Sequence, residues 1–203
     1  AILLERSASP SEPRPPAEAE GYLLAISPMN ITVRARSAAG LFYGCQSLTA
    51  LAVAAPSPRA GQRAVPCLRL DDQPRFAWRG VLLDASRHFF GKDVVQQLLD
   101  VMAQLKLNRF HWHLTDEPGW RIEIKKFPRL TEVGAMGNHT DATAPARFYT
   151  QEDIRQIVAY AAERHIVIVP EIDMPGHASA ASRAFPEISG WGEPPWTGFT
   201  FTP

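Results

Sequence analysis

The stretch from residue 79 to residue 177 decides the fold, because apolar strands alternate in it with amphipathic helices. The strands lie in the segments RGVLLD (79–84), NRFHWHLTD (108–116) and IVIVPEID (166–173). Between them, apolar residues recur at helical spacing over 92–106, and Thr150 with Asp153 gives a capping-box start for a second helix. Continuous apolar strands that alternate with helices indicate parallel strands covered by helices, which is an α/β fold.

Ionisable residues follow each of the three strands at its carboxyl end. Asp84 and Arg87 follow the first strand, Asp116 the second, and Asp173 and His177 the third. Each has a structural explanation when taken singly, such as an ion pair on the rim or a hydrogen bond that stabilises a loop. Both open α/β sheets and (β/α)8 barrels, however, place their chemistry at this end of the strands. We therefore predict that Arg87, Asp116, Asp173 and His177 surround one opening suited to a polar ligand.

The three strands predict only part of a larger domain. A complete (β/α)8 barrel has eight strands and about 250 residues. We therefore predict that residues 75–203 are the N-terminal part of an incomplete TIM (β/α)8 barrel, its first three βα units. Residues 1–74 read as part of a small α/β domain, with a proline-rich loop over 5–20, strands at 22–26 and 31–35, and a helix over 41–55.

Composition excludes several classes of protein. The 203 residues are 45% apolar and 21% charged, which is typical of an ordered globular protein. Lys and Arg number 21 and so do Asp and Glu, so the chain lacks the basic excess of a nucleic-acid-binding protein. No apolar run approaches the roughly 20 residues that span a membrane. The chain begins at Ala1 without a methionine, and we expect the natural start to lie upstream.

Four segments in order resemble the β-N-acetylhexosaminidases of glycoside hydrolase family 20. They read RGVLLDASRHF (79–89), KLNRFHWHLTD (106–116), GWRIEIK (119–125) and PEIDMPGH (170–177). In the front half, EGY (20–22) and GLFYGCQSL (40–48) look like the small α/β domain that precedes the catalytic barrel in that family. The likeness thus extends over most of residues 20–187.

The resemblance implies hydrolysis of terminal, non-reducing, β-linked N-acetylglucosamine or N-acetylgalactosamine. It implies substrate-assisted catalysis with retention, in which the acetamido oxygen of the sugar attacks the anomeric carbon while a glutamic acid protonates the leaving oxygen. The ligand would be an oligosaccharide or glycoconjugate that ends in an N-acetylhexosamine, and no cofactor is implied. By family analogy the compartment would be secreted, periplasmic or lysosomal.

The same resemblance assigns expected roles to individual residues. Arg87 would hold the non-reducing hydroxyls of the terminal sugar with its planar fork. Asp116 and His177 would form a hydrogen-bonded support for the general acid. Asp173 and Glu171 match positions in the pocket wall that orient Arg87 or the sugar. We also expect His113 to bind substrate.

The chain departs from the family pattern at its catalytic pair. That pair is an adjacent Asp-Glu, typically after His-x-Gly-Gly, at the end of the fourth barrel strand, and no such motif occurs here. Asp116 and Glu117 are adjacent but align with the second strand. The pocket tryptophans of the family come from later strands, and we interpret Trp191 and Trp196 as loop residues. We therefore expect an internal fragment that hydrolyses nothing alone.

Two other readings remain open at this stage. One is a metal-dependent barrel hydrolase that uses His111, His113, Asp173 and His177 as ligands, although no feature of the sequence requires a metal. The other is a catalytically silent module that binds or presents a sugar. Metal analysis of the purified chain tests the first, and retained affinity for N-acetylglucosamine without turnover would favour the second.

Overall fold

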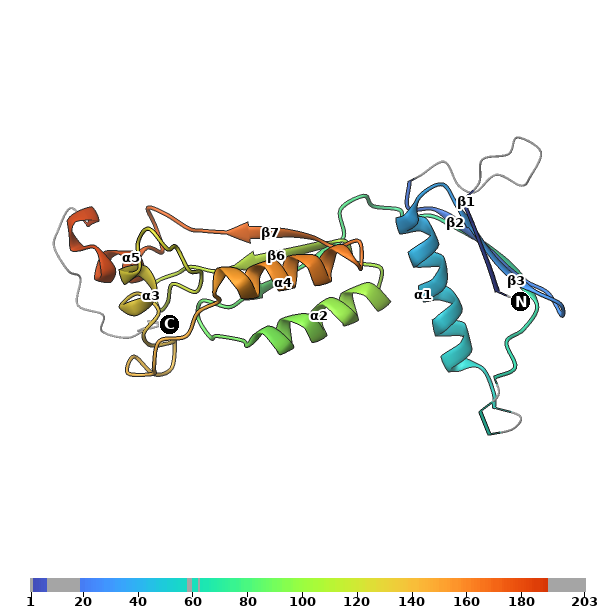
Figure 1. The fold of residues 1–203 in the computed structure, drawn as a ribbon, viewed down its shortest axis with the longest axis horizontal. Helices are drawn as coiled ribbons and strands as arrows, with labels where there is room; N and C mark the ends of the chain where they lie inside the picture. Colours follow the sequence, from blue (N-terminus) through green and yellow to red (C-terminus); the bar gives the residue numbers. More distant parts are fainter. Residues whose placement is uncertain (1, 7–18, 58–59, 62, 190–203) are drawn as a thin grey trace, which may run out of the picture. The chain divides into compact units, whose positions relative to one another are not determined.

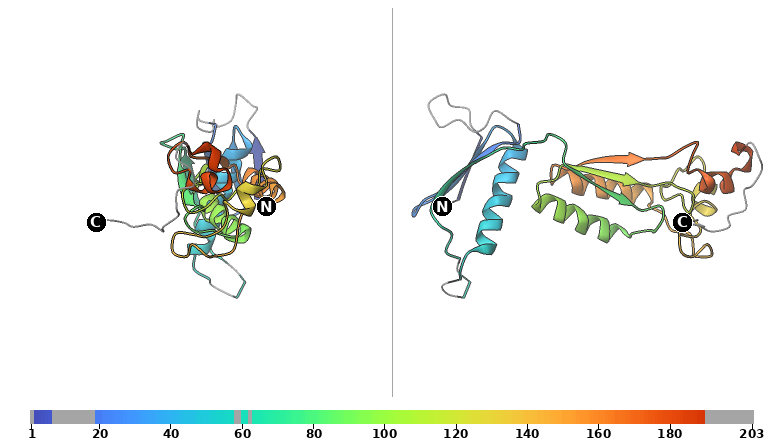
Figure 2. Two further views of the ribbon diagram at one scale, coloured as in Figure 1. Left: turned by 90° about the vertical axis from the view of Figure 1, so that its left-hand side faces the viewer. Right: turned by 180° about the vertical axis from the view of Figure 1, so that it is seen from behind.

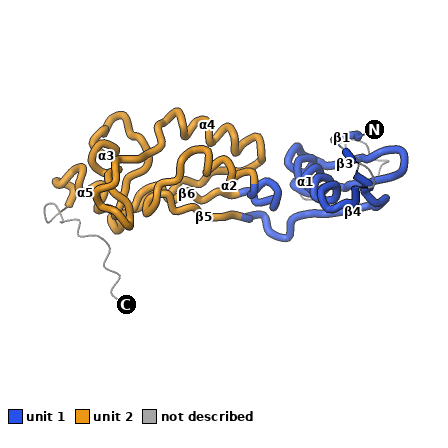
Figure 3. Tube along the Cα trace, turned by 90° about the horizontal axis from the view of Figure 1, so that it is seen from below, with its two compact units in different colours: residues 1–79, 101–108 blue, residues 80–100, 109–203 orange. Residues whose placement is uncertain are grey.

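The computed structural model describes residues 2–6, 19–57, 60–61 and 63–189, which form two compact units. Unit 1 comprises residues 1–79 and 101–108, and unit 2 comprises residues 80–100 and 109–203 (Figure 3). The domain boundary near residue 74 stays a prediction, and these units divide the chain after Arg79. No helix in the described part of the chain is long and apolar enough to cross a membrane.

Unit 1 contains a four-stranded sheet in the order β1-β3-β2-β4. Its strands are β1 (Ile2–Arg6), β2 (Tyr22–Ile26), β3 (Ile31–Ala35) and β4 (Leu68–Asp72). β2 runs antiparallel to both β3 and β4, whereas β1 runs parallel to β3. The strands predicted at 22–26 and 31–35 are confirmed. β1 and β4 were not predicted, and of the expected loop over 5–20, residues 7–18 lie outside the described residues.

Helix α1 (Ala38–Ala54) packs against this sheet (Figure 1). Ser37 caps its first turn, because its hydroxyl accepts a hydrogen bond from Gly40 N at 3.0 Å. A Cβ atom at Gly44 would lie 2.4 Å from Val33 Cγ1, so a glycine is needed where the helix approaches β3. The helix therefore begins before the predicted start at residue 41 and includes both glycines. The core of unit 1 is formed by Tyr22, Leu24, Ile26, Val33, Ala35 and Tyr43.

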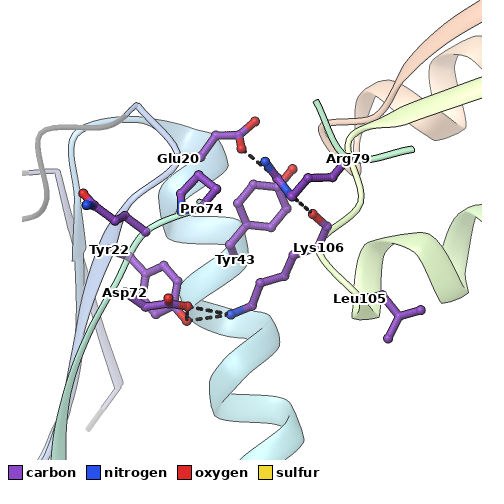
Figure 4. Close-up of a pocket in the computed structure, with 9 residues that line it drawn as sticks. Glu20, Tyr22, Tyr43, Asp72, Pro74, Arg79, Leu105 and Lys106 are labelled. Carbon is purple, nitrogen blue, oxygen red and sulfur yellow. Dashed lines mark hydrogen bonds and ion pairs between the residues drawn. The ribbon is translucent and has the colours of Figure 1, made fainter. Parts of the chain in front are cut away.

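A polar network in unit 1 surrounds Lys106 beside a pocket of about 220 Å³ (Figure 4). Lys106 Nζ donates to Tyr22 Oη at 2.7 Å and to Asp72 Oδ2 at 3.0 Å, and Tyr22 Oη lies 2.6 Å from the same carboxylate oxygen. The backbone of Lys106 is left-handed, with φ of 57°. Bonds from Leu107 N to Met102 O and from Lys106 N to Ala103 O make it the left-handed position of a Schellman motif. Glycine usually takes this position, because it adopts a left-handed backbone at no steric cost. A lysine at this position bears that cost, and its side chain supplies the bonds to Tyr22 and Asp72.

We expect Lys106→Gly to be more stable than Lys106→Ala by about 1 kcal/mol. Both variants lose the side-chain bonds to Tyr22 and Asp72, but only the alanine keeps the cost of a left-handed backbone. Urea unfolding monitored by circular dichroism measures the difference. The same two substitutions at Lys92, in the first turn of a helix, should give the opposite order, because alanine is the better helix former. Equal stabilities of the two Lys106 variants would contradict the prediction.

Unit 2 contains three parallel strands in the order β5-β6-β7. They are β5 (Gly80–Asp84), β6 (Arg109–His113) and β7 (Val167–Glu171). Helices α2 (Lys92–Gln104) and α4 (Gln151–Ala162) lie along one side of them (Figures 1 and 2). The predicted fold class, a partial barrel of three βα units, is confirmed. The capping box of Thr150 and Asp153 at the start of α4 is also confirmed.

The connection from β6 to α4 and the segment after β7 complete unit 2. They contain α3 (Arg129–Glu132), α5 (Ser179–Ala184) and a 3₁₀ helix, Pro186–Ile188. Trp120 and Leu130 form a second small core with three alanines of α5. The interpretation of Trp191 and Trp196 falls outside the described residues.

One edge of the parallel sheet is open and apolar. Within the described residues, β7 pairs with β6 alone. A groove of about 400 Å³ runs beside it, where Val158 of α4 and Val167 of β7 are about half exposed. The groove is also lined by Trp112, Ile154, Ile168 and Pro170.

Candidate active site

The carboxyl ends of the three parallel strands bring together a row of ionisable side chains. Asp84 lies opposite His113 in the register of β5 and β6, and His113 lies opposite Glu171 in the register of β6 and β7. His113 is 7% exposed, and both of its ring nitrogens face carboxylates. Its Nε2 lies 2.8 Å from Asp116 Oδ2, and its Nδ1 lies 3.0 Å from Glu171 Oε2. His113 therefore links the ends of two strands.

Asp116 is the residue that most of the cluster shares. Its side chain is 1% exposed. Its Oδ2 atom lies 2.7 Å from Nη2 of Arg87 and 2.8 Å from Nε2 of His113. Its Oδ1 atom lies 3.2 Å from His177 Nδ1 and accepts a hydrogen bond from Glu117 N at 2.6 Å. Three basic side chains from three different segments thus fix one buried carboxylate.

Arg87 is held by two carboxylates at the end of β5. Its Nη1 donates to Asp84 Oδ2 at 2.6 Å, and its Nη2 contacts Asp116 at 2.7 Å. The other oxygen of Asp84 accepts hydrogen bonds from the backbone N–H groups of Ser86 and Arg87. The Arg87 side chain is 36% exposed, so part of the guanidinium faces solvent. Sequence analysis placed Asp84 at the end of the first strand but predicted no site role for it, although a carboxylate three positions before an arginine at a strand end indicates a possible partner for that arginine.

Both members of the Asp84–Arg87 pair are stabilised in their charged forms. Burial opposes ionisation of Asp84, but hydrogen bonds from the backbone and guanidinium of Arg87 outweigh it and lower the pKa of Asp84. Burial also disfavours the charged guanidinium, but the hydrogen bond to Asp84 and the charge of Asp116 outweigh it and raise the pKa of Arg87. The pair is therefore fully ionised at neutral pH.

His113 and Glu171 show the same compensation. Burial lowers the pKa of His113, but its contacts with Asp116 and then Glu171 have the larger combined effect, so the pKa is raised. Burial raises the pKa of Glu171, but its hydrogen bond to His113 and the charge of that imidazole lower it overall. These shifts favour a protonated His113 beside an ionised Glu171.

We expect an NMR titration to give His113 a pKa above the usual value for histidine, and Glu171→Gln to lower it. Because the folded-state pKa of His113 is raised, its contribution to stability is complete below the unfolded value of about 6.5 and is lost as pH rises through the folded value. Glu171 has a lowered pKa, so its contribution is present above the unfolded value of about 4.3 and is lost as pH falls through the folded value. A pKa of His113 at or below the usual value would contradict the prediction.

The structure brings most of the predicted site residues together, with one exception. Arg87, His113 and Asp116 form one connected cluster with Glu171 and His177. His111 Nε2 also lies 2.5 Å from Glu171 Oε2. Asp173 donates its backbone N–H to Thr115 Oγ1 at 2.9 Å, and within the described residues its carboxylate forms no ion pair. The catalytic and binding roles of all these residues stay predictions.

The alternative metal site does not assemble from its four proposed ligands. His111 and His113 face Glu171, and His177 turns toward Asp116 and not toward Asp173. Among the described residues, no group of three or more potential ligands is arranged to hold a metal ion. The ring nitrogens of these histidines face the carboxylates of Glu171 and Asp116 instead.

Comparisons with known proteins point to one family. Residues 76–198 match the catalytic domain of glycosyl hydrolase family 20, and residues 3–73 match its domain 2. A beta-hexosaminidase of Porphyromonas gingivalis is 45% identical over 177 residues, which cover 86% of this chain and 23% of the relative. An N,N'-diacetylchitobiase of Vibrio harveyi is 38% identical over 182 residues, covering 81% of this chain and 20% of the relative.

Solved structures agree with the sequence comparisons. The N-acetyl-beta-hexosaminidase of Streptomyces plicatus, solved in complex with Thio-NAglucal, is 40% identical, with a TM-score of 0.85. The match covers 98% of this chain and 39% of that one, so the chain spans well under half of the protein it resembles. The two family matches together extend over nearly all of the chain. The chain therefore belongs to glycosyl hydrolase family 20.

Proposed function

We propose that the whole protein is a β-N-acetylhexosaminidase. It removes terminal, non-reducing, β-linked N-acetylglucosamine or N-acetylgalactosamine from oligosaccharides or glycoconjugates, with retention at the anomeric carbon. The observation that carries the proposal is the cluster in which Asp116 joins Arg87, His113 and His177 at the mouth of the parallel strands. The name of the Vibrio harveyi relative supports short chitin oligosaccharides as one substrate class.

Arg87 is the residue that holds the terminal sugar. Asp84 and Asp116 each occupy one terminal nitrogen of its guanidinium, and they fix its plane. The remaining N–H donors and the exposed part of the group are available to the hydroxyls at the non-reducing end of the sugar. A sugar with a further residue at that end would lose these contacts, which accounts for exo action.

Asp116 and His177 support the acid that protonates the leaving oxygen. Asp116 Oδ1 lies 3.2 Å from His177 Nδ1, and so the other ring nitrogen of His177 is directed away from Asp116. A carboxylic acid placed at that nitrogen would be oriented by it, and the charge of Asp116 would tune its proton affinity. We assign this acid, and the carboxylate that orients the acetamido group, to residues of the whole protein outside these 203.

In this assignment the nucleophile is the acetamido group of the sugar itself. The acetamido oxygen attacks the anomeric carbon, the glycosidic bond breaks, and the leaving oxygen takes the proton of the acid. Water then opens the cyclic intermediate and returns the proton to the acid. The described residues serve to bind and orient the sugar in both steps.

The experiment compares two chromogenic glycosides with the whole protein. We expect turnover of p-nitrophenyl N-acetyl-β-glucosaminide and at least about a thousandfold lower kcat/KM for the matching β-glucoside, which lacks the acetamido nucleophile. The isolated 203-residue chain should turn over neither, since it lacks the acid. Equal rates on the two glycosides, or turnover by the isolated chain, would overturn the proposal, and sugar binding without turnover by the whole protein would favour a silent module.

A further inference from the structure

Arg121 is a buried cation whose every N–H donor goes to the backbone. Its side chain is among the largest that are fully buried, and the residue is 1% exposed. Nε and Nη2 both donate to Ser86 O, at 3.1 and 2.9 Å. Nη1 donates to Ala135 O at 2.7 Å and to Arg147 O at 3.1 Å, and Nη2 also donates to Gly137 O at 2.7 Å. These five bonds use all five N–H groups of a guanidinium.

The four carbonyl groups belong to two segments that are far apart in sequence. Ser86 lies in the turn that carries Arg87, whereas the other three acceptors lie in the loop 135–147. A second bond ties the loop to the same turn, because His139 N donates to Arg87 O at 2.8 Å. Ser86 Oγ donates to Gly119 O at 2.6 Å, which anchors the turn from a third side.

We propose that Arg121, with the loop 135–147 that it fastens, is a positioning residue that sets the place of Arg87 against the terminal sugar. The inference rests on the proposed function and deepens it. Arg121 does not itself touch the sugar, since none of its N–H donors is left for a ligand. It acts through Ser86, the immediate neighbour of Arg87 in the chain.

The composition of the Arg121 site argues for a dedicated role. Within the described residues, no carboxylate forms an ion pair with Arg121, so the carbonyl dipoles that it contacts directly, together with the more distant charge of Asp84, offset the cost of burying its charge. Burial, together with the charge of Arg183, lowers the pKa of Arg121 to about 10, so it is still protonated at neutral pH. A Cβ atom at Gly119 would lie 2.2 Å from Arg121 Cζ, so the chain leaves room for this group.

Lysine cannot reproduce this arrangement. Its ammonium has three donors at one point, whereas the four acceptors surround a planar group with five. In Arg121→Lys at least one carbonyl in either the Ser86 turn or the loop loses its partner. Arg87 then still contacts Asp84 and Asp116, but the turn that carries it loses hydrogen bonds from residue 121 to Ser86 O.

The test is a ratio that does not depend on how much enzyme is folded. It compares kcat/KM for p-nitrophenyl N-acetyl-β-glucosaminide with that for its 4-deoxy analogue, which lacks one hydroxyl at the non-reducing end. In the whole protein, Arg121→Lys should lower this ratio by about tenfold, as expected for loss of one well-placed hydrogen bond to a charged group. A merely structural loss would lower both rates equally and leave the ratio unchanged.

Arg164→Lys is the matched control. Arg164 also donates to a backbone carbonyl, that of Tyr160, and to Asp100 in α2, and these partners lie outside the turn of Arg87 and the loop 135–147. Its substitution should weaken the fold without moving the ratio. Should Arg121→Lys fail to fold, Asn138→Ala replaces it, because Asn138 Oδ1 accepts three bonds that shape the exposed part of the same loop. That variant should lower the ratio by about two- to threefold.

Failure of the inference can be told from failure of the proposed function. Absence of turnover of either glycoside by the wild-type protein, or a wild-type ratio near one, would defeat the proposed function and the inference with it. A wild-type preference for the intact sugar that stays the same in Arg121→Lys, or in Asn138→Ala where that variant is the one that folds, would overturn the inference alone. An equal fall of the ratio in Arg164→Lys would also overturn it, since any loosening of the fold would then suffice.

Discussion

Arg87→Lys in the whole protein is expected to lower kcat/KM for a chromogenic N-acetylglucosaminide by about a thousandfold, or about 4 kcal/mol. The guanidinium reaches Asp84 at 2.6 Å and Asp116 at 2.7 Å with two separate nitrogens, and it still presents donors to solvent. A single ammonium cannot meet both carboxylates and the sugar at once, although it keeps the charge. Most of the loss should appear in kcat/KM for the intact sugar and much less for its 4-deoxy analogue.

Steady-state kinetics with both glycosides check this expectation. Arg155→Lys is the matched control, because Arg155 pairs with Glu152 on the exposed face of α4 at 2.9 Å and both side chains are more than 60% exposed. It should leave the rates and the preference unchanged. A loss below about tenfold for Arg87→Lys would contradict the role assigned to its planar fork.

Asp116→Asn should lower kcat by about a thousandfold, with a smaller change in KM. The substitution preserves shape but removes the charge that Arg87, His113 and His177 share. His177 would lose the partner that orients it toward the acid, and a neutral amide would present a donor to a cation at one of its two positions. Losses of this size follow when a buried carboxylate that orients a catalytic histidine is replaced by its amide.

The measurement needs a check on folding, because the variant leaves basic groups near a buried site without their counter-charge. Urea unfolding of the variant supplies this check. Asp100→Asn is the matched control, since Asp100 accepts from Tyr160 and Arg164 between α2 and α4, away from the strand ends. A kcat of Asp116→Asn within about tenfold of wild type would show that the acid needs no such support.

Local sequence patterns predicted the parts of the fold whose signals are local. The apolar runs of β5 and β7 and the capping box of Thr150 each depend on neighbouring residues only, and all three lie where expected. β4 was missed because LRLDD is short and three of its five residues are charged, and its strand conformation comes from pairing with β2, which is distant in sequence. The same holds for β1, whose pairing partner is β3.

The candidate site was predictable as a set of residues but not as a pattern of contacts. Topology alone places the residues after parallel strands at one end of a sheet, which is why Arg87, Asp116 and His177 were found together. The choice of partners was not predictable, since it depends on side-chain directions a few residues beyond each strand. His177 therefore pairs with Asp116 and not with Asp173, which is nearer to it in sequence.

The contacts of Arg121 were even less predictable from the sequence. Its partners are backbone carbonyls, and a carbonyl is present at every residue, so no residue type marks the other end of the contact. Within its own segment it reads as one of several basic residues, next to Glu123 and Lys125. Only the folded chain distinguishes a cation enclosed by carbonyl groups from one that is solvated.

The open edge of β7 has a practical consequence for work with the isolated polypeptide. Among the described residues no strand pairs with the outer edge of β7, and half-exposed valines lie beside it. Copies of the isolated polypeptide should therefore join strand to strand at high concentration, which lowers soluble yield and raises particle size. A lysine in place of Val167 puts charge on that margin without reaching the ionised row at the other end of the strands. Dilute, monodisperse samples of such a variant are the material in which histidine titrations become practicable.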